Sequence, residues 1–363
     1  MKIISQLLLV LSVASLCACH KTPPPPPPPP PPHAVTVYTC GSGTGEGYTV
    51  ASWKNDSVIA LPSTGGYATC IALSGTDVYV GGATGFTLYP TYWMNQNEIS
   101  VTFPPVQPQS LVEVEGIAVS GGDVYCAVSS YYGPMSPFLS SVGGITKNDS
   151  LLYTRIGVAT GIALSGTDVY WSTYYQQVTN PYTGQVTLPV AGYYKNGVLS
   201  LLEDSTGTTS YATAIFVSGN DVYVAGQRLS KSNGKSIALY WKNGVAFPLS
   251  DSTANATATA ITVSGSNVYV AGYEAVGVQT EAGGNSMAKY WKNGTAVALT
   301  NGNNPAEATG IAVSGSDVYV CGFEGGVYSG VYRTGTYWKN SVPVRLGDST
   351  VASEASAIAL STQ

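Results

Sequence analysis

The sequence predicts an all-β protein: a seven-bladed β-propeller with four antiparallel strands in each blade and a last blade closed by strands from both chain ends. Three observations lead to this prediction: the composition, an internal repeat, and two half-units at the chain ends that complete each other. Only 10% of the 363 residues are charged, whereas 42 are Gly and 26 are Tyr. Aromatic residues fit pleated sheets and Gly fits turns, so this composition favours strands and tight turns over solvated helices.

Two motifs alternate along the chain from residue 33 onward. The first is a hairpin, (T/A)-x-I-x-(V/L)-S-G-x-(D/N)-V-Y, and its tyrosines are Tyr79, Tyr125, Tyr170, Tyr223, Tyr269 and Tyr319. The second is related to YWKNG and is centred on Trp53, Trp93, Thr146, Tyr194, Trp241, Trp291 and Trp338. Ser-Gly-x-Asp and Lys-Asn-Gly supply turn residues that tolerate positive φ. Each unit therefore contains four strands, A and B from the first motif and C and D from the second.

The spacing of the units is that of a propeller blade. Residues 33–363 are 331 in number, and 331/7 is about 47 per unit; four strands in roughly 40–50 residues are typical of a blade. Six units are complete, and their strands A are predicted to begin near Thr69, Glu115, Thr160, Thr213, Thr259 and Thr309. The seventh is split between residues 357–361 and the N-terminal segments AVTVYTCG, YTVASWKN and SVIAL. Pairing the two ends in one sheet removes the open edges of a linear array.

The units resemble those of bacterial repeat β-propeller proteins that carry SGxDVYVAG…YWKNG units, a family of unknown function. The resemblance covers residues 34–363. It implies the architecture and carries no activity with it.

The N-terminus resembles the signal of a bacterial lipoprotein. Lys2 precedes a short apolar run that ends in Leu16-Cys17-Ala18-Cys19, a lipobox-like sequence. The resemblance implies a signal peptide over residues 1–18 and a lipidated Cys19 held in the bacterial cell envelope; an ordinary secretory signal is the alternative. The residues after Cys19 lack the Asp that retains many lipoproteins at the inner membrane, which favours the outer membrane, with the periplasmic or surface side left open.

Ten consecutive prolines, residues 23–32, follow the lipobox. Proline fixes φ and lacks an N–H, so the segment is predicted to be an extended polyproline II rod. We expect residues 19–33 to be a spacer between the lipid and the propeller, with a binding site for a proline-recognising domain as the alternative.

The loops that do not repeat are the predicted ligand-binding region. Strand order places the B–C and D–A loops at one end of the ring, and loops on a rigid scaffold often carry binding sites. The B–C loops over residues 129–144, 173–192, 227–236, 273–286 and 323–335 are rich in Tyr, Ser, Gly and Asn, the residues typical of antibody paratopes. The candidates for a protein- or glycan-binding surface are Tyr131, Tyr132, Tyr174, Tyr175, Tyr182, Tyr273, Tyr328, Tyr332 and Arg333. The alternative is that these rings only pack the loops together.

Several function classes are excluded or disfavoured. Lys and Arg occur singly and the formal charge is −5, so no basic stripe exists for nucleic acid. The only histidines, His20 and His33, precede the repeats, which excludes Ser-His-Asp, Cys-His and His-rich metal sites within the ring. A carboxylate-dependent hydrolase or lyase stays open, and the carboxylates to test are Glu115, Glu274, Glu307 and Glu324. We assign no catalytic residue, cofactor or metal site, and expect a monomer.

Three residue sets receive structural interpretations. The five Trp at the YWKN positions are expected to pack between blades rather than to bind sugars. Asp204, Asp251 and Asp348 begin DST triplets that are typical of turn caps, with calcium ligation as the alternative. Cys40, Cys70, Cys126 and Cys321 are expected to be small buried hydrophobic residues with free thiols.

Together these observations predict a membrane-anchored, non-enzymatic binding or scaffold module that recognises a protein or glycan through its Tyr-rich loops. The alternative is a carboxylate-dependent polysaccharide hydrolase or lyase.

Overall fold

The computed structural model describes residues 34–362, apart from residues 46, 86–87, 105–109, 132–140, 176–177, 181–184, 187, 204–207, 281–282, 327–330 and 348–351. Ala34–Gln363 is one compact unit. The described residues form strands and turns and contain no helix; accordingly none of them lies in a helix long and apolar enough to cross a membrane.

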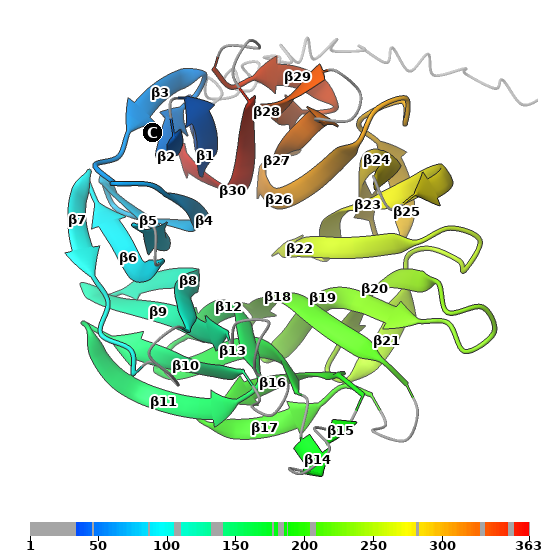
Figure 1. The fold of residues 1–363 in the computed structure, drawn as a ribbon, viewed down its shortest axis with the longest axis horizontal. Helices are drawn as coiled ribbons and strands as arrows, with labels where there is room; N and C mark the ends of the chain where they lie inside the picture. The colour runs from blue at the N-terminus through cyan, green and yellow to red at the C-terminus, as the bar shows by residue number, and fades with distance from the viewer. Residues whose placement is uncertain are drawn as a thin grey trace, which may run out of the picture. The chain divides into compact units, whose positions relative to one another are not determined.

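Seven four-stranded antiparallel sheets surround a common axis, which confirms the predicted seven-bladed β-propeller (Figure 1). We number the blades 1 to 7 in the order in which their innermost strands occur. The innermost strands, A, are β4 (Gly66–Ser74), β8 (Leu111–Ser120), β12 (Val158–Ser165), β18 (Ser210–Ser218), β22 (Ala256–Ser264), β26 (Ala306–Ser314) and β30 (Ala352–Thr362). Strands B are β5 (Asp77–Thr84), β9 (Asp123–Tyr131), β13 (Asp168–Tyr175), β19 (Asp221–Leu229), β23 (Asn267–Thr280), β27 (Asp317–Gly326) and β1 (Val35–Gly45).

The two outer strands of each blade follow in the same order. Strands C are β6 (Tyr89–Met94), β10 (Val142–Lys147), β16 (Val190–Lys195), β20 (Ser236–Lys242), β24 (Gly283–Lys292), β28 (Val331–Lys339) and β2 (Gly47–Lys54). Strands D are β7 (Asn97–Ser100), β11 (Ser150–Ile156), β17 (Val198–Leu201), β21 (Val245–Pro248), β25 (Thr295–Ala298), β29 (Val342–Arg345) and β3 (Ser57–Ala60). A small hairpin, β14 (Val178–Asn180) and β15 (Gln185–Val186), is inserted between β13 and β16.

The ring closes as predicted. β30 pairs antiparallel with β1, with Leu360 opposite Val37 and Ile358 opposite Thr39. Blade 7 therefore has the order β3-β2-β1-β30 and joins the two ends of the ring.

Strand A starts earlier than the sequence predicted in every blade. In blade 1, for example, the strand begins at Gly66 instead of Thr69. In blades 1 to 6 the residue predicted as the strand start is in fact a β-bulge, where one extra residue interrupts the register with strand B. In blade 7 the bulge is Ser356, one residue before the predicted start. The segment before the bulge lacks the repeated motif, so its strand character was not visible. The predicted B–C loops over residues 273–286 and 323–335 were likewise wrong. β23 and β24 occupy most of the first, and β27 and β28 occupy most of the second.

The core lies between neighbouring blades. The tryptophans of the YWKN positions are 0–2% exposed, which confirms their packing role: Trp53, Trp93, Trp241, Trp291 and Trp338. Blade 3 has Tyr194 at this position, and its ring stacks on Trp171 of strand B with the centroids 4.7 Å apart. The four cysteines of the ring are buried free thiols, as predicted.

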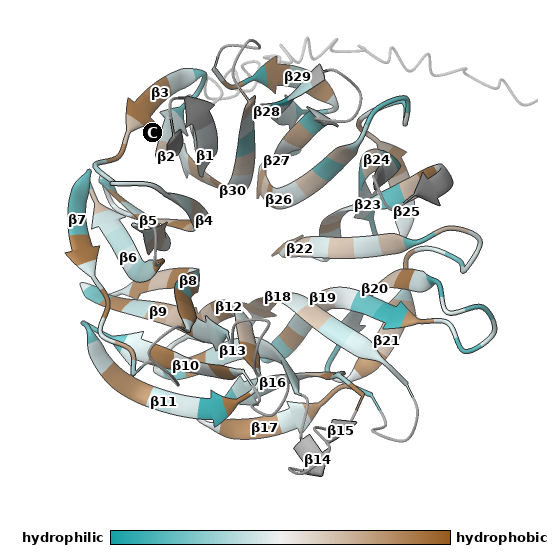
Figure 2. Ribbon diagram, in the orientation of Figure 1, coloured by the Kyte–Doolittle hydropathy of each residue, from teal (hydrophilic) through white to brown (hydrophobic). Residues whose placement is uncertain are grey.

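The outermost strands keep hydrophobic side chains on their solvent side. Val58 on β3 is 62% exposed and Val198 on β17 is 70% exposed. Brown hydrophobic segments on β3, β11 and β17 mark the same rim in Figure 2.

Candidate functional site

The two ends of the ring are built differently. We call the end that holds the A–B and C–D turns the turn end, and the opposite end, where strands A begin and strands B finish, the loop end. An end whose polar side chains make the same structural contacts in every blade is a poor candidate for a binding site. An end that carries side chains found in only some blades is a better candidate.

At the turn end of blade 4 the C–D turn is bound to the start of strand B by one asparagine. Asn243 has φ 50, and its backbone N–H donates to the carbonyl of Val222 at 2.9 Å. Its side-chain Oδ1 accepts from the Val222 N–H at 2.9 Å, and its Nδ2 donates to Asp221 Oδ1 at 2.7 Å. Lys242 pairs with Asp221 at 2.7 Å and lies over the Tyr223 ring at 5.3 Å. These contacts explain why DVY and YWKNG recur together.

The asparagine contact recurs in all seven blades. The side-chain oxygens of Asn55, Asn95, Asn148, Asn196, Asn243, Asn293 and Asn340 accept from the N–H groups of Val37, Val78, Val124, Val169, Val222, Val268 and Val318. The predicted turn role of these motifs is confirmed, since all seven asparagines have positive φ. The turn end is therefore uniform, and its polar groups bind one another.

The loop end also has a repeated element, formed by the bulge residues of strands A. They are Thr69, Glu115, Thr160, Thr213, Thr259, Thr309 and Ser356. Thr213, Thr259 and Thr309 donate to carbonyl oxygens of the following blade, Ala258, Ala308 and Ala355, at 2.7, 2.6 and 2.6 Å. Thr69 donates to Val114 of the next blade in the same way. These hydroxyls join neighbouring blades near the axis.

The glycine of the VYVAG motif is part of this arrangement. A Cβ added to Gly226 would lie 2.0 Å from the Tyr211 carbonyl oxygen, and one added to Gly272 would lie 2.0 Å from that of Thr257. Only Gly leaves room for the strand A backbone as it approaches the bulge. Blades 2 and 3 depart from the pattern, because Val128 and Thr173 replace this glycine and pair with Val114 and Ala159 of strand A.

Blades 2 and 3 are also where the threonine contacts change. Thr160 donates to Ser172 Oγ of its own blade at 2.9 Å. Blade 2 has Glu115 in place of the threonine, and this carboxylate accepts a hydrogen bond from the Tyr131 hydroxyl. The loop end therefore loses its repetition around Glu115.

Glu115 belongs to a pair of carboxylates. Glu113 lies two residues earlier on β8 and accepts from the hydroxyl of Tyr67 in blade 1. Desolvation of the Glu115 carboxyl, followed by the charge of Glu113, raises the pKa of Glu115 to about 8. Glu115 is thus largely protonated at neutral pH, while part of the residue still reaches solvent.

Two further tyrosines complete the group. Tyr174 of β13 and Tyr211 of β18 meet edge to face with centroids 5.1 Å apart. Burial and then the charge of Glu115 raise the pKa of Tyr174 to about 12. Burial and then the same carboxylate also raise the pKa of the Tyr131 hydroxyl. We call this group the Glu–Tyr cluster, and its members, all partly buried, are Tyr67, Glu113, Glu115, Tyr131, Tyr174 and Tyr211.

A second acidic group lies at the loop end, in blades 6 and 7. Arg333 pairs with Glu354 at 2.7 Å, and its guanidinium carbon lies 4.1 Å from the centroid of the Phe323 ring. Ser42 also donates to Glu354 at 3.4 Å. Burial raises the pKa of Glu307, while the charge of Arg333 opposes that rise. This group therefore contains its own cation.

The structure distributes the predicted binding residues unevenly. Tyr131 and Tyr174 belong to the Glu–Tyr cluster, whereas Tyr175 and Tyr273 are partly buried elsewhere at the loop end. Tyr332 is 57% exposed, and Arg333 is exposed and paired as described. Tyr132, Tyr182 and Tyr328 lie outside the described residues, as does Cys19.

Sequence reasoning missed Tyr67, Glu113 and Tyr211. All three lie two residues before a bulge, on the part of strand A that precedes the repeated motif. A signal was present, because aligning the units places Tyr67, Glu113, Val158, Tyr211, Thr257, Glu307 and Glu354 at one equivalent position. Because the residue type at this position differs from blade to blade, the fold does not require one particular side chain there.

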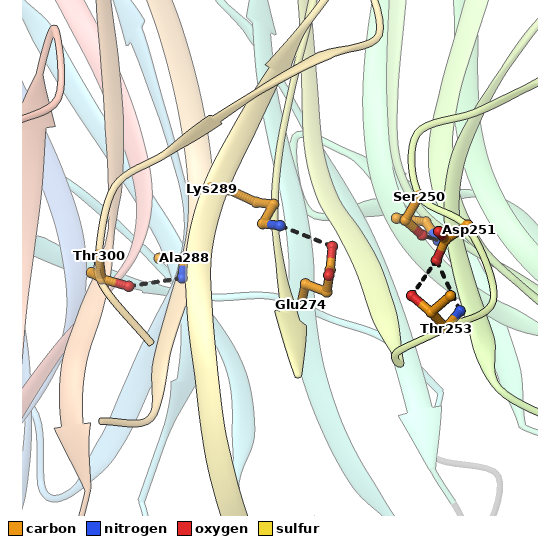
Figure 3. Close-up of polar contacts among 8 residues, drawn as sticks. Ser250, Asp251, Thr253, Glu274, Ala288, Lys289 and Thr300 are labelled. Carbon is orange, nitrogen blue, oxygen red and sulfur yellow. Dashed lines mark hydrogen bonds and ion pairs between the residues drawn. The ribbon is translucent and has the colours of Figure 1, made fainter. Parts of the chain in front are cut away.

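The other predicted carboxylates have structural partners or lie apart. Glu274 pairs with Lys289 at 2.8 Å, and the two side chains point toward each other in Figure 3. Asp251 accepts from the Thr253 N–H at 2.8 Å, as expected for a turn cap (Figure 3). Glu324 is partly buried on β27, and Asp204 and Asp348 lie outside the described residues. Across the described parts of the chain, His, Cys, Asp and Glu nowhere gather in a group of three or more that could hold a metal ion.

Comparison with known proteins identifies the fold and no family. No protein-family model and no curated protein matches the sequence. An ulvan lyase of a new polysaccharide lyase family matches with a TM-score of 0.51 at 9% identity, over 85% of this chain and 85% of that chain. An acylaminoacyl peptidase in complex with a chloromethyl ketone matches with a TM-score of 0.51 at 10% identity, over 87% of this chain. The match covers 51% of the peptidase, so the chain spans about half of its length. At these identities the similarities establish the propeller fold alone.

Proposed function

We propose that the propeller is a glycan-binding module whose contact region is the loop end, centred on the Glu–Tyr cluster, and that a lipid on Cys19 tethers it to the bacterial outer membrane. One observation carries the choice of region. The turn end repeats the same asparagine contact in seven blades, whereas the loop end gathers unique tyrosines and carboxylates around Glu115.

The residue types favour a sugar over a large protein surface. Carboxylate oxygens accept hydrogen bonds from hydroxyl groups, and aromatic faces pack against the C–H faces of sugar rings. Four members of the cluster lie on the innermost strands β4, β8 and β18, and the other two lie near the ends of the adjacent strands β9 and β13. All six are only partly exposed. A chain of sugar rings reaches such a position more readily than the flat face of a globular protein does.

A glycan array with the full-length chain tests the proposal. We expect binding to a limited set of glycans, and loss of that binding when Tyr174 or Tyr211 is replaced by Ala. Asp221→Asn, at the turn end, is the control and should bind like the wild type. Equal loss in the control, or binding that survives both tyrosine changes, would place the contact region elsewhere. Capture of a protein partner in place of any glycan would reject the glycan proposal.

The tether has an independent test. Growth of the source bacterium with an alkyne-labelled fatty acid should label the wild-type chain and leave Cys19→Ser unlabelled and released from the membrane fraction. Labelling of the Cys19→Ser chain would contradict the assignment.

Carboxylate-dependent hydrolysis or elimination of a polysaccharide is the second candidate. The observation that favours it is the Glu113–Glu115 pair, in which one carboxyl is largely protonated and the other accepts from Tyr67. An acid and a base side by side are the minimum that such reactions require. Incubation of each bound glycan with the protein separates the two candidates: a binding module leaves the chain length unchanged, whereas an enzyme shortens it and Glu115→Gln does not.

A further inference from the structure

The Glu–Tyr cluster has no cation of its own. Seven ion pairs occur in the described part of the chain, and neither Glu113 nor Glu115 takes part in any of them. Glu113 and Glu115 receive hydrogen bonds from tyrosine hydroxyls. Because Glu115 is largely protonated, the negative charge of the pair rests on Glu113. The hydrogen bond from Tyr67 solvates this carboxylate without cancelling its charge, and a negative charge in a desolvated site ordinarily has a partner.

On the other side of the ring, carboxylates at the equivalent position lie beside a cation that the protein itself supplies. Glu307 and Glu354 occupy the position equivalent to Glu113, two residues before the bulge of their strands. There Arg333 supplies the cation, paired with Glu354 at 2.7 Å and stacked on Phe323. The B–C loop end of blade 6 can therefore provide a cation, and the cluster formed by blades 1 to 4 has none among its members.

The aromatic rings are a second and independent observation. The cluster contains four tyrosines from four blades. Tyr67 and Tyr131 donate to the carboxylates, and Tyr174 and Tyr211 are held edge to face. The hydroxyls of Tyr67 and Tyr131 are occupied by the carboxylates, so what these residues present to a ligand is the ring. The negative faces of aromatic rings attract ammonium groups, and the attraction strengthens when the site is desolvated.

We propose that the Glu–Tyr cluster binds a protonated amino group of its ligand, so that the glycan recognised is one that carries free amino sugars. The Glu113 carboxylate supplies the opposite charge that the protein leaves unmatched, and the tyrosine rings supply the surrounding aromatic faces. This inference rests on the proposed glycan-binding function and narrows it to a chemical class of ligand.

Two matched oligosaccharides test the inference. A hexamer of glucosamine and a hexamer of N-acetylglucosamine have the same backbone and differ in whether each nitrogen is a charged amine or a neutral amide. Calorimetric titration of the full-length chain at pH 6, where the amines are protonated, should show at least tenfold tighter binding of the glucosamine hexamer. Raising the salt concentration from about 0.05 to 0.5 M should reduce that preference.

The variants separate this site from a general attraction of an acidic protein for a cationic sugar. Glu115→Gln replaces a carboxyl that is largely protonated at this pH and should retain most of the preference. Glu113→Gln keeps the shape of the side chain and removes the charge, so it should reduce the preference severalfold. Glu274→Gln removes the same charge from the loop end of blade 5, where Glu274 already pairs with Lys289, and should leave the preference unchanged. Circular dichroism and thermal unfolding confirm that each variant is folded.

The possible outcomes are distinct. Equal affinities for the two hexamers, or tighter binding of the acetylated one, overturn the ammonium inference and leave the glycan proposal standing. Binding of neither hexamer, together with a glycan array without hits, overturns the glycan proposal and this inference with it. A preference that Glu274→Gln reduces as much as Glu113→Gln does overturns the assignment to the cluster.

Discussion

The turn asparagines offer the most quantitative test of how the repeat stabilises the ring. In blade 4, replacing Asn243 by Ala removes the acceptor for the Val222 N–H and the donor to Asp221. Each lost hydrogen bond costs about 1 kcal/mol. The residue has φ 50, and a side chain with a Cβ and no local hydrogen bond pays about a further 1 kcal/mol there. Asn243→Ala should therefore lower the free energy of unfolding by about 3 kcal/mol.

Asn243→Gly is the matched control for the backbone contribution. Gly loses the same two hydrogen bonds and adopts positive φ without a steric cost, so it should lose about 2 kcal/mol and stay more stable than the Ala variant. Urea unfolding followed by tryptophan fluorescence measures both changes. Equal midpoints for the two variants would refute the backbone argument, and wild-type midpoints for both would refute the role of the side chain.

Three further predictions concern the axis side of the ring. Thr259→Val removes the hydroxyl that donates to Ala308 of the next blade and should lower the free energy of unfolding by about 1–2 kcal/mol, whereas Thr259→Ser should stay within about 0.5 kcal/mol in the same urea assay. The raised pKa of Glu115 lets the native state hold a proton that the unfolded state releases, so the free energy of unfolding should fall as pH rises from about 5 through 8. Glu115→Gln should remove this decline, which is on the order of 3 kcal/mol. Parallel pH profiles of the free energy of unfolding for the wild type and the variant would contradict the prediction. Deleting residues 352–362 removes β30 from blade 7 and should abolish cooperative thermal unfolding in calorimetry; a transition near the wild-type temperature would argue against closure.

The fold was predictable because the scaffold constrains the repeated residues directly. The alternation of DVY and YWKNG reflects a single contact, that of the asparagine with the start of strand B. The split blade followed from counting half-units, and β30 pairs with β1 as predicted. The bulge was hidden, because a threonine inside a strand reads like any other β-branched residue.

The site was predictable only in part for the same reason. Glu115 was one of four carboxylates named for testing, but no motif around it predicted its partners. Tyr131 and Tyr174 were identified from loop composition, but Glu113, Tyr67 and Tyr211 precede the motif and belong to three blades. These residues come close together because the innermost strands of neighbouring blades lie near one another around the axis. That proximity is a property of the folded ring and cannot be seen in the order of the residues along the chain.

The measurement that tests the central claim most directly is hydrogen–deuterium exchange of the full-length chain with and without a glycan found on the array. We expect the bound glycan to slow exchange at the loop end of blades 1 to 4, over the first residues of β4, β8 and β18 and the last residues of β9 and β13. The asparagine turns at the opposite end should be unaffected. Protection confined to those turns, or to the outermost strands, would contradict the assignment of the Glu–Tyr cluster as the functional site.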